Sequence, residues 1–319
     1  MAELLVFSER DDLAFELLSK GKEFSSALNM KLSAVLLGEK IDANAKANEY
    51  FAFGADRVYA GENPALADFN AESFAEALYQ IGQQNDVKIL LLPSTKRGKE
   101  LGPRVAQKLG AGCVTDATAV EVKDGDLVVS RYSLGGNTVA VEMLKTPHKV
   151  ITVMPKTFEL GVKESKQGEV VKVNLNLKSP RTQIVERQEK VGEKVNLEDA
   201  EVIVCIGRGL EKKEDLGIIG QLSKALGAEI GCTKSLCTDY QWLSEDRLVG
   251  LSGKKTGPRL VISVGISGQI QYTVGIRDAR ITVAINKDNQ APIFALSDYG
   301  IVGNLYDVVP LLTEKLKSL

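Results

Sequence analysis

Residues 260–309 read LVISVGISGQIQYTVGIRDARITVAINKDNQAPIFALSDYGIVGNLYDVV, and this stretch decides the fold. The apolar, β-branched run Val261 to Val264 is too short for an uncapped helix and is typical of a strand covered on both faces. A second strand, Ile281 to Ile285, ends in the polar residues Asn286 and Lys287. In open α/β sheets ligands bind at the carboxyl ends of the strands, so these two strand ends predict a nucleotide site.

The turn after the first of these strands has features of a phosphate-binding loop. Gly265 and Gly268 bracket Ser267 in it. Glycine accepts positive φ and lets a ligand approach the backbone, while Ser267 can cap a helix that begins near Gln269. The free N–H groups of such a helix attract phosphate. An ordinary α/β core with glycine turns has the same periodicity, so the pattern by itself leaves that alternative open.

Composition limits the class of protein. The chain has 319 residues, enough for two domains with a core each, and a formal net charge of −2. The balanced, interspersed charges argue against nucleic acid as a partner. The sequence has no apolar run suited to a membrane span, and its amino terminus leads directly into a strand and an acidic segment rather than a basic signal peptide. We therefore expect a soluble, cytoplasmic protein.

Strands and helices alternate through the first half of the chain. Strands are expected at 3–8, 31–38, 56–61 and 87–94, and helices at 11–29, 43–51, 72–83 and 99–109. This alternation predicts a mainly parallel, doubly wound sheet. After Ala117 the pattern changes to strand-like segments joined by the turn Asp124-Gly125, which predicts an antiparallel edge.

A domain connection is expected where the sequence turns polar and charged, between Gly161 and Asp199. Within it VVKVNLNL, residues 170–177, alternates like a strand that crosses toward another element or a partner. The boundary is placed near Lys190, giving domains 1–189 and 190–319. The second domain is expected to resume with the strand EVIVCIG and a helix that ends at Gly227, so that both domains are α/β with mainly parallel sheets.

Several segments of the sequence resemble the electron transfer flavoprotein α subunit. They are VGISGQIQY, VAINKDNQAPIF and SDYGIVGNLYDVVPLL near the carboxyl terminus, GRGLEKKEDL and VGLSGKKTGPRL before them, and more loosely LGPRVAQKLGAGCVTDATAV in the first half. The resemblance covers nearly the whole chain. It implies an FAD-binding carboxyl-terminal domain, a first domain that serves as platform for a β subunit, and electron carriage from dehydrogenases, such as the acyl-CoA type, to another redox protein. The β subunit would hold AMP, or a second FAD in an electron-bifurcating, NADH-linked variant.

The resemblance also implies which positions bind FAD. Arg208 matches a position at the phosphates, where a planar guanidinium can hold two oxygens, although a solvated surface arginine is the alternative. The remaining positions implied are the loop Ser267, Gly268, Gln269, Ile270 and Gln271, the second strand end Asn286 and Lys287, the adenosine end Asn304 and Leu305, and, around the flavin, Thr233, Lys234, Gly250, Leu251, Ser252 and Tyr272.

Four flavin neighbours depart from the pattern of the family. Lys234 stands for an arginine, Leu251 for a glutamine, Ser252 for a threonine and Tyr272 for a histidine. Lysine keeps a positive charge without a flat stacking surface, and a phenol stays neutral where histidine can be charged. We therefore expect weaker stabilisation of the one-electron-reduced flavin anion and a lower one-electron potential. Surface-exposed roles for Lys234 and a covering role for Tyr272 are the alternatives.

The sequence also bears on functions other than electron carriage. One alternative is a redox-silent nucleotide-binding module with the same fold. The departures from the family pattern at Lys234, Leu251 and Tyr272 keep this alternative open. A nicotinamide-dependent enzyme is disfavoured, because neither half has GxGxxG after its first strand. With one histidine and four scattered cysteines, the chain offers no catalytic triad or metal-ligand set, so no catalytic residue and no metal are expected.

Overall fold

The computed structural model describes residues 1–182, 184–186 and 195–318. The chain divides into two compact units, Met1–Arg187 and Gln188–Leu319. The boundary predicted near Lys190 falls outside the described residues. Within the residues described, no helix combines the length and apolarity needed to cross a bilayer.

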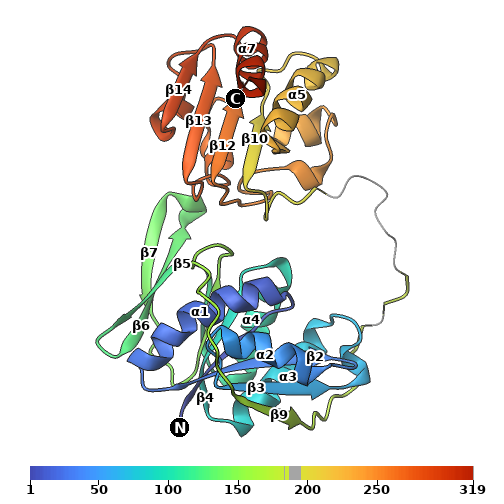
Figure 1. The fold of residues 1–319 in the computed structure, drawn as a ribbon, viewed down its shortest axis with the longest axis vertical. Helices are drawn as coiled ribbons and strands as arrows, with labels where there is room; N and C mark the ends of the chain where they lie inside the picture. The colour runs from blue at the N-terminus through green and yellow to red at the C-terminus, as the bar shows by residue number, and fades with distance from the viewer. Residues whose placement is uncertain (183, 187–194, 319) are drawn as a thin grey trace. The chain divides into compact units, whose positions relative to one another are not determined.

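The first unit is a sheet of nine strands in the order β7-β6-β5-β8-β4-β1-β2-β3-β9, with helices on its faces (Figure 1). Its elements are β1 (Glu3–Phe7), α1 (Asp11–Ala27), β2 (Lys31–Gly38), α2 (Ala43–Ala52), β3 (Arg57–Glu62), α3 (Ala71–Gln84), β4 (Val87–Pro93), α4 (Lys96–Leu109), β5 (Gly112–Lys123), β6 (Asp126–Ser133), β7 (Thr138–Met143), β8 (Lys149–Val153) and β9 (Glu169–Val173). The strands and helices expected from alternation are confirmed.

The antiparallel edge is also confirmed. Strands β5, β6 and β7 pair antiparallel, and β5 and β6 are joined by Asp124 and Gly125, with φ of 52° and 77°. Two residues at positive φ suit the right-handed twist of a tight hairpin, which explains the Asp-Gly sequence. The strand expected in VVKVNLNL is β9, and it pairs in parallel with β3 as the other edge of this same sheet.

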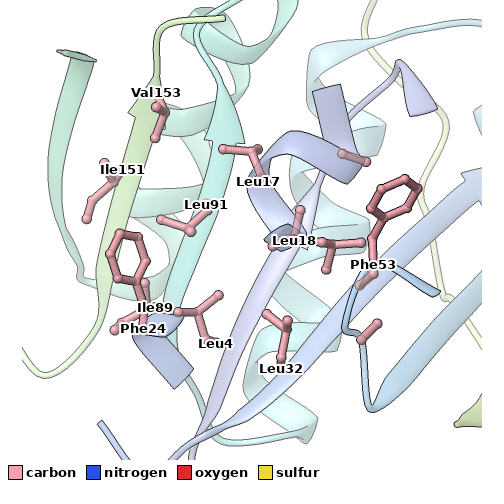
Figure 2. Close-up of a cluster of buried hydrophobic side chains, with 14 of the residues drawn as sticks. Leu4, Leu17, Leu18, Phe24, Leu32, Phe53, Ile89, Leu91, Ile151 and Val153 are labelled. Carbon is pink, nitrogen blue, oxygen red and sulfur yellow. The ribbon is translucent and has the colours of Figure 1, made fainter. Parts of the chain in front are cut away.

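The core of the first unit lies on both faces of the parallel strands. Figure 2 shows one face, where Leu17, Leu18 and Phe24 of α1 pack against side chains of β1, β4 and β8, among them Leu91 and Ile151. Helices α3 and α4 cover the opposite face. Since both faces are covered, the parallel strands read as continuous apolar runs.

A buried carboxylate ties three neighbouring strands together at the start of β1. Glu3 is 3% exposed and accepts hydrogen bonds from Ser33 Oγ (2.8 Å), Tyr59 Oη (2.9 Å) and Arg57 Nη1 (2.9 Å). Arg57 also donates to Glu169 of β9, at 2.7 Å. The buried charge is thereby paired and hydrogen-bonded, as a charge inside a protein must be.

The second unit is a parallel sheet in the order β11-β10-β12-β13-β14. Its elements are β10 (Val202–Ile206), α5 (Leu216–Leu226), β11 (Glu229–Cys232), β12 (Leu260–Val264), α6 (Ile270–Thr273), β13 (Ile281–Asn286), β14 (Tyr299–Val302) and α7 (Leu305–Lys317). Helices α5 and α7 cover one face, and residues around Tyr272 and Ile293 cover the other. The predicted fold class, two α/β units with mainly parallel sheets, is confirmed.

Candidate functional site

The carboxyl edge of the second sheet contains a point where the strand order reverses. From β10 the chain goes to β11 on one side and then to β12, β13 and β14 on the other. Loops that leave β10 and β12 therefore run in opposite directions and open a crevice between them, which is where open α/β sheets bind ligands. The crevice expected from the sequence beyond β12 and β13 thus extends to β10.

A small cavity of about 50 Å³ lies across these strand ends. It is lined by Gly209, Glu211, Gly265, Ile285, Asn286, Lys287, Asn304 and Leu305. Pockets that enclose a whole small ligand measure roughly 300–1,000 Å³. This cavity is therefore suited to one part of an extended ligand. Gly209, Glu211 and Gly265 were not among the predicted site residues, although the glycines of GRGL and VGIS are the signal for them.

Glycines keep the backbone of the crevice open. Gly209 donates its N–H to the Gly265 carbonyl at 3.0 Å, and a Cβ on Gly209 would lie 2.6 Å from Gly265 Cα. Gly268 has φ of 91°, and a Cβ there would lie 2.3 Å from the Ile293 nitrogen. Only glycine permits these contacts, so the positions of these loops depend on it.

Two asparagines hold the loops of the crevice. Asn286 donates from Nδ2 to the Ile266 carbonyl at 2.8 Å and accepts the Asp288 N–H at 3.0 Å. Asn304 caps α7 by accepting the Tyr306 N–H at 3.1 Å, while Leu305 is buried at the first position of that helix. Both asparagines, predicted from the sequence as ligand contacts, thus also fix the ends of β13 and α7.

Three cations stand at this edge. Arg208 follows β10, Lys234 follows β11 and Lys287 follows β13, and all three are exposed. Within the part of the chain that the structure describes, their side chains make no hydrogen bond or ion pair. Glu211 in the cavity lining offsets part of this charge, and the remaining excess of positive charge beside open backbone favours an anionic ligand.

The loop after residue 249 joins the loop that leads into α6. Leu251 donates its N–H to the Gln271 carbonyl at 2.7 Å, and Gly250, with φ of 137°, has no room for a Cβ against the same carbonyl. This pairing brings together predicted site residues of two segments, of which Leu251, Ser252, Gln269, Ile270 and Gln271 are exposed. Thr233 directly follows β11 and is half-buried, and its Oγ1 lies 3.2 Å from Ser235 Oγ.

The expected helix cap is wrong. Helix α6 has only four residues, Gln269 is its N-cap residue without a side-chain hydrogen bond, and Ser267 does not cap it. Instead the Ser267 carbonyl accepts the Ile293 N–H at 3.0 Å and its side chain is exposed. The reason is that Gly268 at positive φ turns the chain away before the helix begins. So short a helix is no phosphate site on its own.

Tyr272 also differs from expectation. It is 4% exposed, and its hydroxyl lies 2.7 Å from Ser263 Oγ of β12, inside the core. Burial, with Cys205 as a second cause, raises the pKa of Tyr272 well above its ordinary value. The phenol is neutral, as predicted, but its hydroxyl is bonded in the core rather than offered at the crevice. The side chain of Tyr272 points into the core because of tertiary packing and its hydroxyl partner Ser263, which the sequence alone does not show.

Comparison with known proteins places these features in a family. Residues 5–178 match the electron transfer flavoprotein domain, and residues 196–277 match the electron transfer flavoprotein FAD-binding domain. The electron transfer flavoprotein subunit alpha of Thermoanaerobacterium thermosaccharolyticum is 33% identical over 99% of this chain and 98% of its own length. Those of Bacillus subtilis and Megasphaera elsdenii are 33% and 35% identical, covering 98% and 96% of this chain and 94% and 92% of their own lengths.

The FAD-binding match begins before β10 and includes the loops that carry Arg208, Lys234, Leu251 and Gln271. FAD is the cofactor of this unit. Its diphosphate is the kind of anion that an open, cationic crevice accommodates. The chain belongs to the family of electron transfer flavoprotein α subunits.

Proposed function

We propose that this chain, paired with a β subunit, accepts electrons from dehydrogenases of the acyl-CoA type and passes them to another redox protein. Membership of the electron transfer flavoprotein α subunits supports the carrier role and the pairing with a β subunit. The observation that carries the proposal is the cationic, glycine-lined crevice at the carboxyl edge of the second sheet. The cytoplasmic location expected from the sequence stays a prediction.

The residues of the crevice fit the parts of FAD. Arg208 and Lys287 are exposed cations suited to the diphosphate, and the planar fork of Arg208 can hold two of its oxygens. Leu251 and Ile270 are exposed apolar side chains suited to a flat ring system. When bound, FAD supplies the electron-transfer chemistry, while the protein supplies binding, orientation and electrostatics.

Lys234 is the residue that we propose to tune the flavin. It is exposed at the carboxyl end of β11, without a partner among the described residues, so its charge is available to a reduced, negatively charged flavin. The Tyr272 hydroxyl is bonded to Ser263 in the core, so we do not propose it as the group that tunes the flavin.

A redox titration tests the role of Lys234. The Lys234→Arg variant should raise the first-electron potential, because arginine keeps the charge and adds a planar stacking surface. Lys317→Arg in the last turn of α7 is the matched control and should leave the potential unchanged. An unchanged potential in Lys234→Arg would contradict the proposed tuning.

The β6–β7 hairpin is the surface that we propose for the β subunit. Val139 and Val141 of β7, the strand labelled beside β6 in Figure 1, are 58% and 67% exposed. Because they stand two residues apart on a strand, their side chains face the same side of the hairpin. Leu134, in the turn between β6 and β7, is 76% exposed. Paired exposed apolar side chains on a sheet edge mark a protein interface rather than a solvated surface.

A charge placed on this surface tests the pairing. Val141→Lys should weaken heterodimer formation, measured by co-purification and analytical ultracentrifugation. Val162→Lys is the matched control, since Val162 is also exposed but lies outside the hairpin. If Val141→Lys and Val162→Lys weaken heterodimer formation equally, the hairpin is not part of the interface.

An anaerobic reductive titration of the heterodimer tests the function itself. One FAD per heterodimer with AMP, reduced stepwise by a dehydrogenase and its substrate, is the expected result. Two FAD reducible by NADH would instead identify the bifurcating alternative. A heterodimer that binds nucleotide but no reducible flavin would overturn the proposal in favour of a redox-silent module.

A further inference from the structure

A cavity of about 500 Å³ in the first unit is not used by the proposed function. It lies at the carboxyl ends of β1 and β2, and its lining includes Phe7, Gly38, Leu66, Phe69 and Arg97. The parallel strands of this sheet run in the order β9-β3-β2-β1-β4-β8-β5. From β1 the chain goes to β2 and β3 on one side and then to β4 on the other, as in dinucleotide-binding sheets. Its volume is within the range of small-molecule sites, roughly 300–1,000 Å³.

The floor of the cavity suits a flat aromatic group. Phe7, Leu66 and Phe74 are buried and apolar. At the rim, the Arg97 guanidinium lies 4.9 Å from the centroid of the Phe69 ring. Both groups are planar and offer stacking surfaces, as arginine and aromatic side chains do in nucleobase sites.

An acidic side chain stands where dinucleotide-binding sheets hold ribose. Glu39 directly follows β2, is exposed, lines the cavity and has no hydrogen-bond or ion-pair partner within the described residues. Its loop is fixed by the Ile41 N–H, which donates to Glu62 Oε1 at 2.8 Å. In dinucleotide-binding sheets an acidic residue at this place accepts hydrogen bonds from ribose hydroxyls. The long helix α1 sets Glu39 farther from β1 than the usual spacing of about twenty residues, so a spacing search misses it.

The place of the phosphates, in contrast, is occupied by carboxylates, with Lys40, Lys46 and Arg97 elsewhere in the lining. The first turn of α1 carries Asp11 and Asp12, and Glu9 precedes it. Asp11 faces the cavity, held by the Tyr50 hydroxyl at 2.8 Å and by Lys46 Nζ at 3.0 Å, while Glu9 accepts from Thr95 Oγ1 at 2.6 Å. These carboxylates occupy the helix terminus that would otherwise attract phosphate.

We propose that this cavity binds a purine nucleoside without phosphate. The base would lie on the apolar floor beside Phe69 and Arg97, and the ribose hydroxyls would donate to Glu39. The proposal does not depend on the electron-transfer role of the second unit.

Calorimetric titration of the heterodimer with adenosine and with AMP tests the proposal. Adenosine should bind more tightly than AMP at this site, because Glu9 and Asp11 stand where the phosphate would lie and Lys46 offsets only the charge of Asp11. Glu39→Gln and Arg97→Ala should each weaken adenosine binding at least about fivefold, through the lost charge-assisted hydrogen bond and the lost stacking surface. Glu121→Gln on the exposed side of β5 is the matched control. The partner chain is the same in every sample, so only differences between variants report this cavity.

A charge variant separates the two halves of the proposed site. Glu9→Gln removes one negative charge and should reduce the difference between the binding affinities for adenosine and AMP. No heat from adenosine at millimolar concentration, or equal adenosine affinity in Glu39→Gln and the unchanged protein, would overturn the proposal. Tighter binding of AMP than adenosine that Glu39→Gln and Arg97→Ala both weaken would overturn the exclusion of phosphate. The Tm of each variant, measured without nucleoside, reports on folding of the first unit.

Discussion

The two sheets of this chain differ at the same place, the carboxyl ends of their parallel strands. In the second unit that edge combines glycine contacts at Gly209 and Gly268 with exposed cations, Arg208 and Lys287 among them. In the first unit the corresponding edge has no such glycine turn after β1, and Glu9, Asp11 and Glu39 line its cavity. Related topologies thus place exposed cations beside open backbone at the edge of one unit, and a mixture of carboxylates and cations, Lys40, Lys46 and Arg97 among them, at the edge of the other.

The difference shows which residues decide what a parallel sheet binds. Strand order creates a crevice in both units, but the residues of the first loop determine whether phosphate can enter it. Glycine lets backbone N–H groups approach a ligand. Carboxylates in the first turn of a helix instead take up the positive end of the helix dipole that would attract a phosphate. The following variants change one side of this comparison at a time.

The largest effect is expected from Gly268→Ala. A Cβ there would lie 2.3 Å from the Ile293 nitrogen, and the φ of 91° adds strain, about 1–2 kcal/mol in left-handed backbone. The loop must move, so FAD affinity should fall by about 100-fold or more, measured by flavin fluorescence during titration. Gly217→Ala in α5 is the control, because nothing lies within 4 Å of its Cβ, and it should leave FAD binding intact. Full FAD affinity in Gly268→Ala would show that this glycine does not shape the crevice.

Arg208→Ala should have the next largest effect. Hydrogen bonds to a charged group are worth about 1.5–3 kcal/mol, which corresponds to a loss of FAD affinity of about 10- to 150-fold. The loss should shrink at high salt, because the interaction is partly electrostatic. Arg259→Ala, at the amino end of β12, removes the same charge from the opposite edge and should change FAD affinity little. If both variants bind FAD alike, net charge rather than position is the cause.

A smaller effect is expected from Asn286→Ala. The variant removes the hydrogen bond to the Ile266 carbonyl, worth about 0.5–1.5 kcal/mol, and loosens the loop that it positions. FAD affinity should fall by up to about tenfold, with a parallel fall in Tm of the FAD-free protein. Asn289→Ala, in the exposed turn after β13, should affect neither. A loss of affinity with no fall in Tm would instead make Asn286 a direct ligand contact.

The smallest effect on FAD is expected from Tyr272→Phe. The hydroxyl is bonded to Ser263 in the core, so FAD affinity should change less than about twofold, while an unpartnered Ser263 costs about 1–3 kcal/mol of unfolding free energy. Adding Ser263→Ala should restore part of that stability in denaturant unfolding. The reverse pattern, full stability with weakened FAD binding, would place Tyr272 at the crevice after all.

Local patterns predicted most of the strands, because their signals lie within a few residues. The β-branched runs of β12 and β13 and the polar residues after them are of this kind, and Asn286 and Lys287 lie at the carboxyl edge as expected. Strand β14 gave no such signal, since all four of its residues are exposed and no buried face marks it.

Contacts between distant segments could not be predicted in the same way. The approach of Gly209 to Gly265 depends on β10 and β12 being neighbours, which is a property of strand order rather than of either segment. Likewise the inward orientation of Tyr272 depends on Ser263 on the adjoining strand. The family resemblance indicated the positions, whereas the direction of each side chain is decided by tertiary packing.

The buried carboxylate Glu3 couples the substitutions that several positions can accept. Its partners Ser33, Tyr59 and Arg57 stand on neighbouring strands, and losing Arg57 leaves the buried Glu3 carboxylate without its cation. Losing Glu3 alone leaves the hydroxyls of Ser33 and Tyr59 without their acceptor, while Arg57 keeps its bonds to Glu169 and Tyr59. Replacing the whole set by apolar residues of similar volume, in contrast, can be neutral. Substitutions here should therefore be inherited together, and a chimera that exchanges only one of these strands with a relative should misfold.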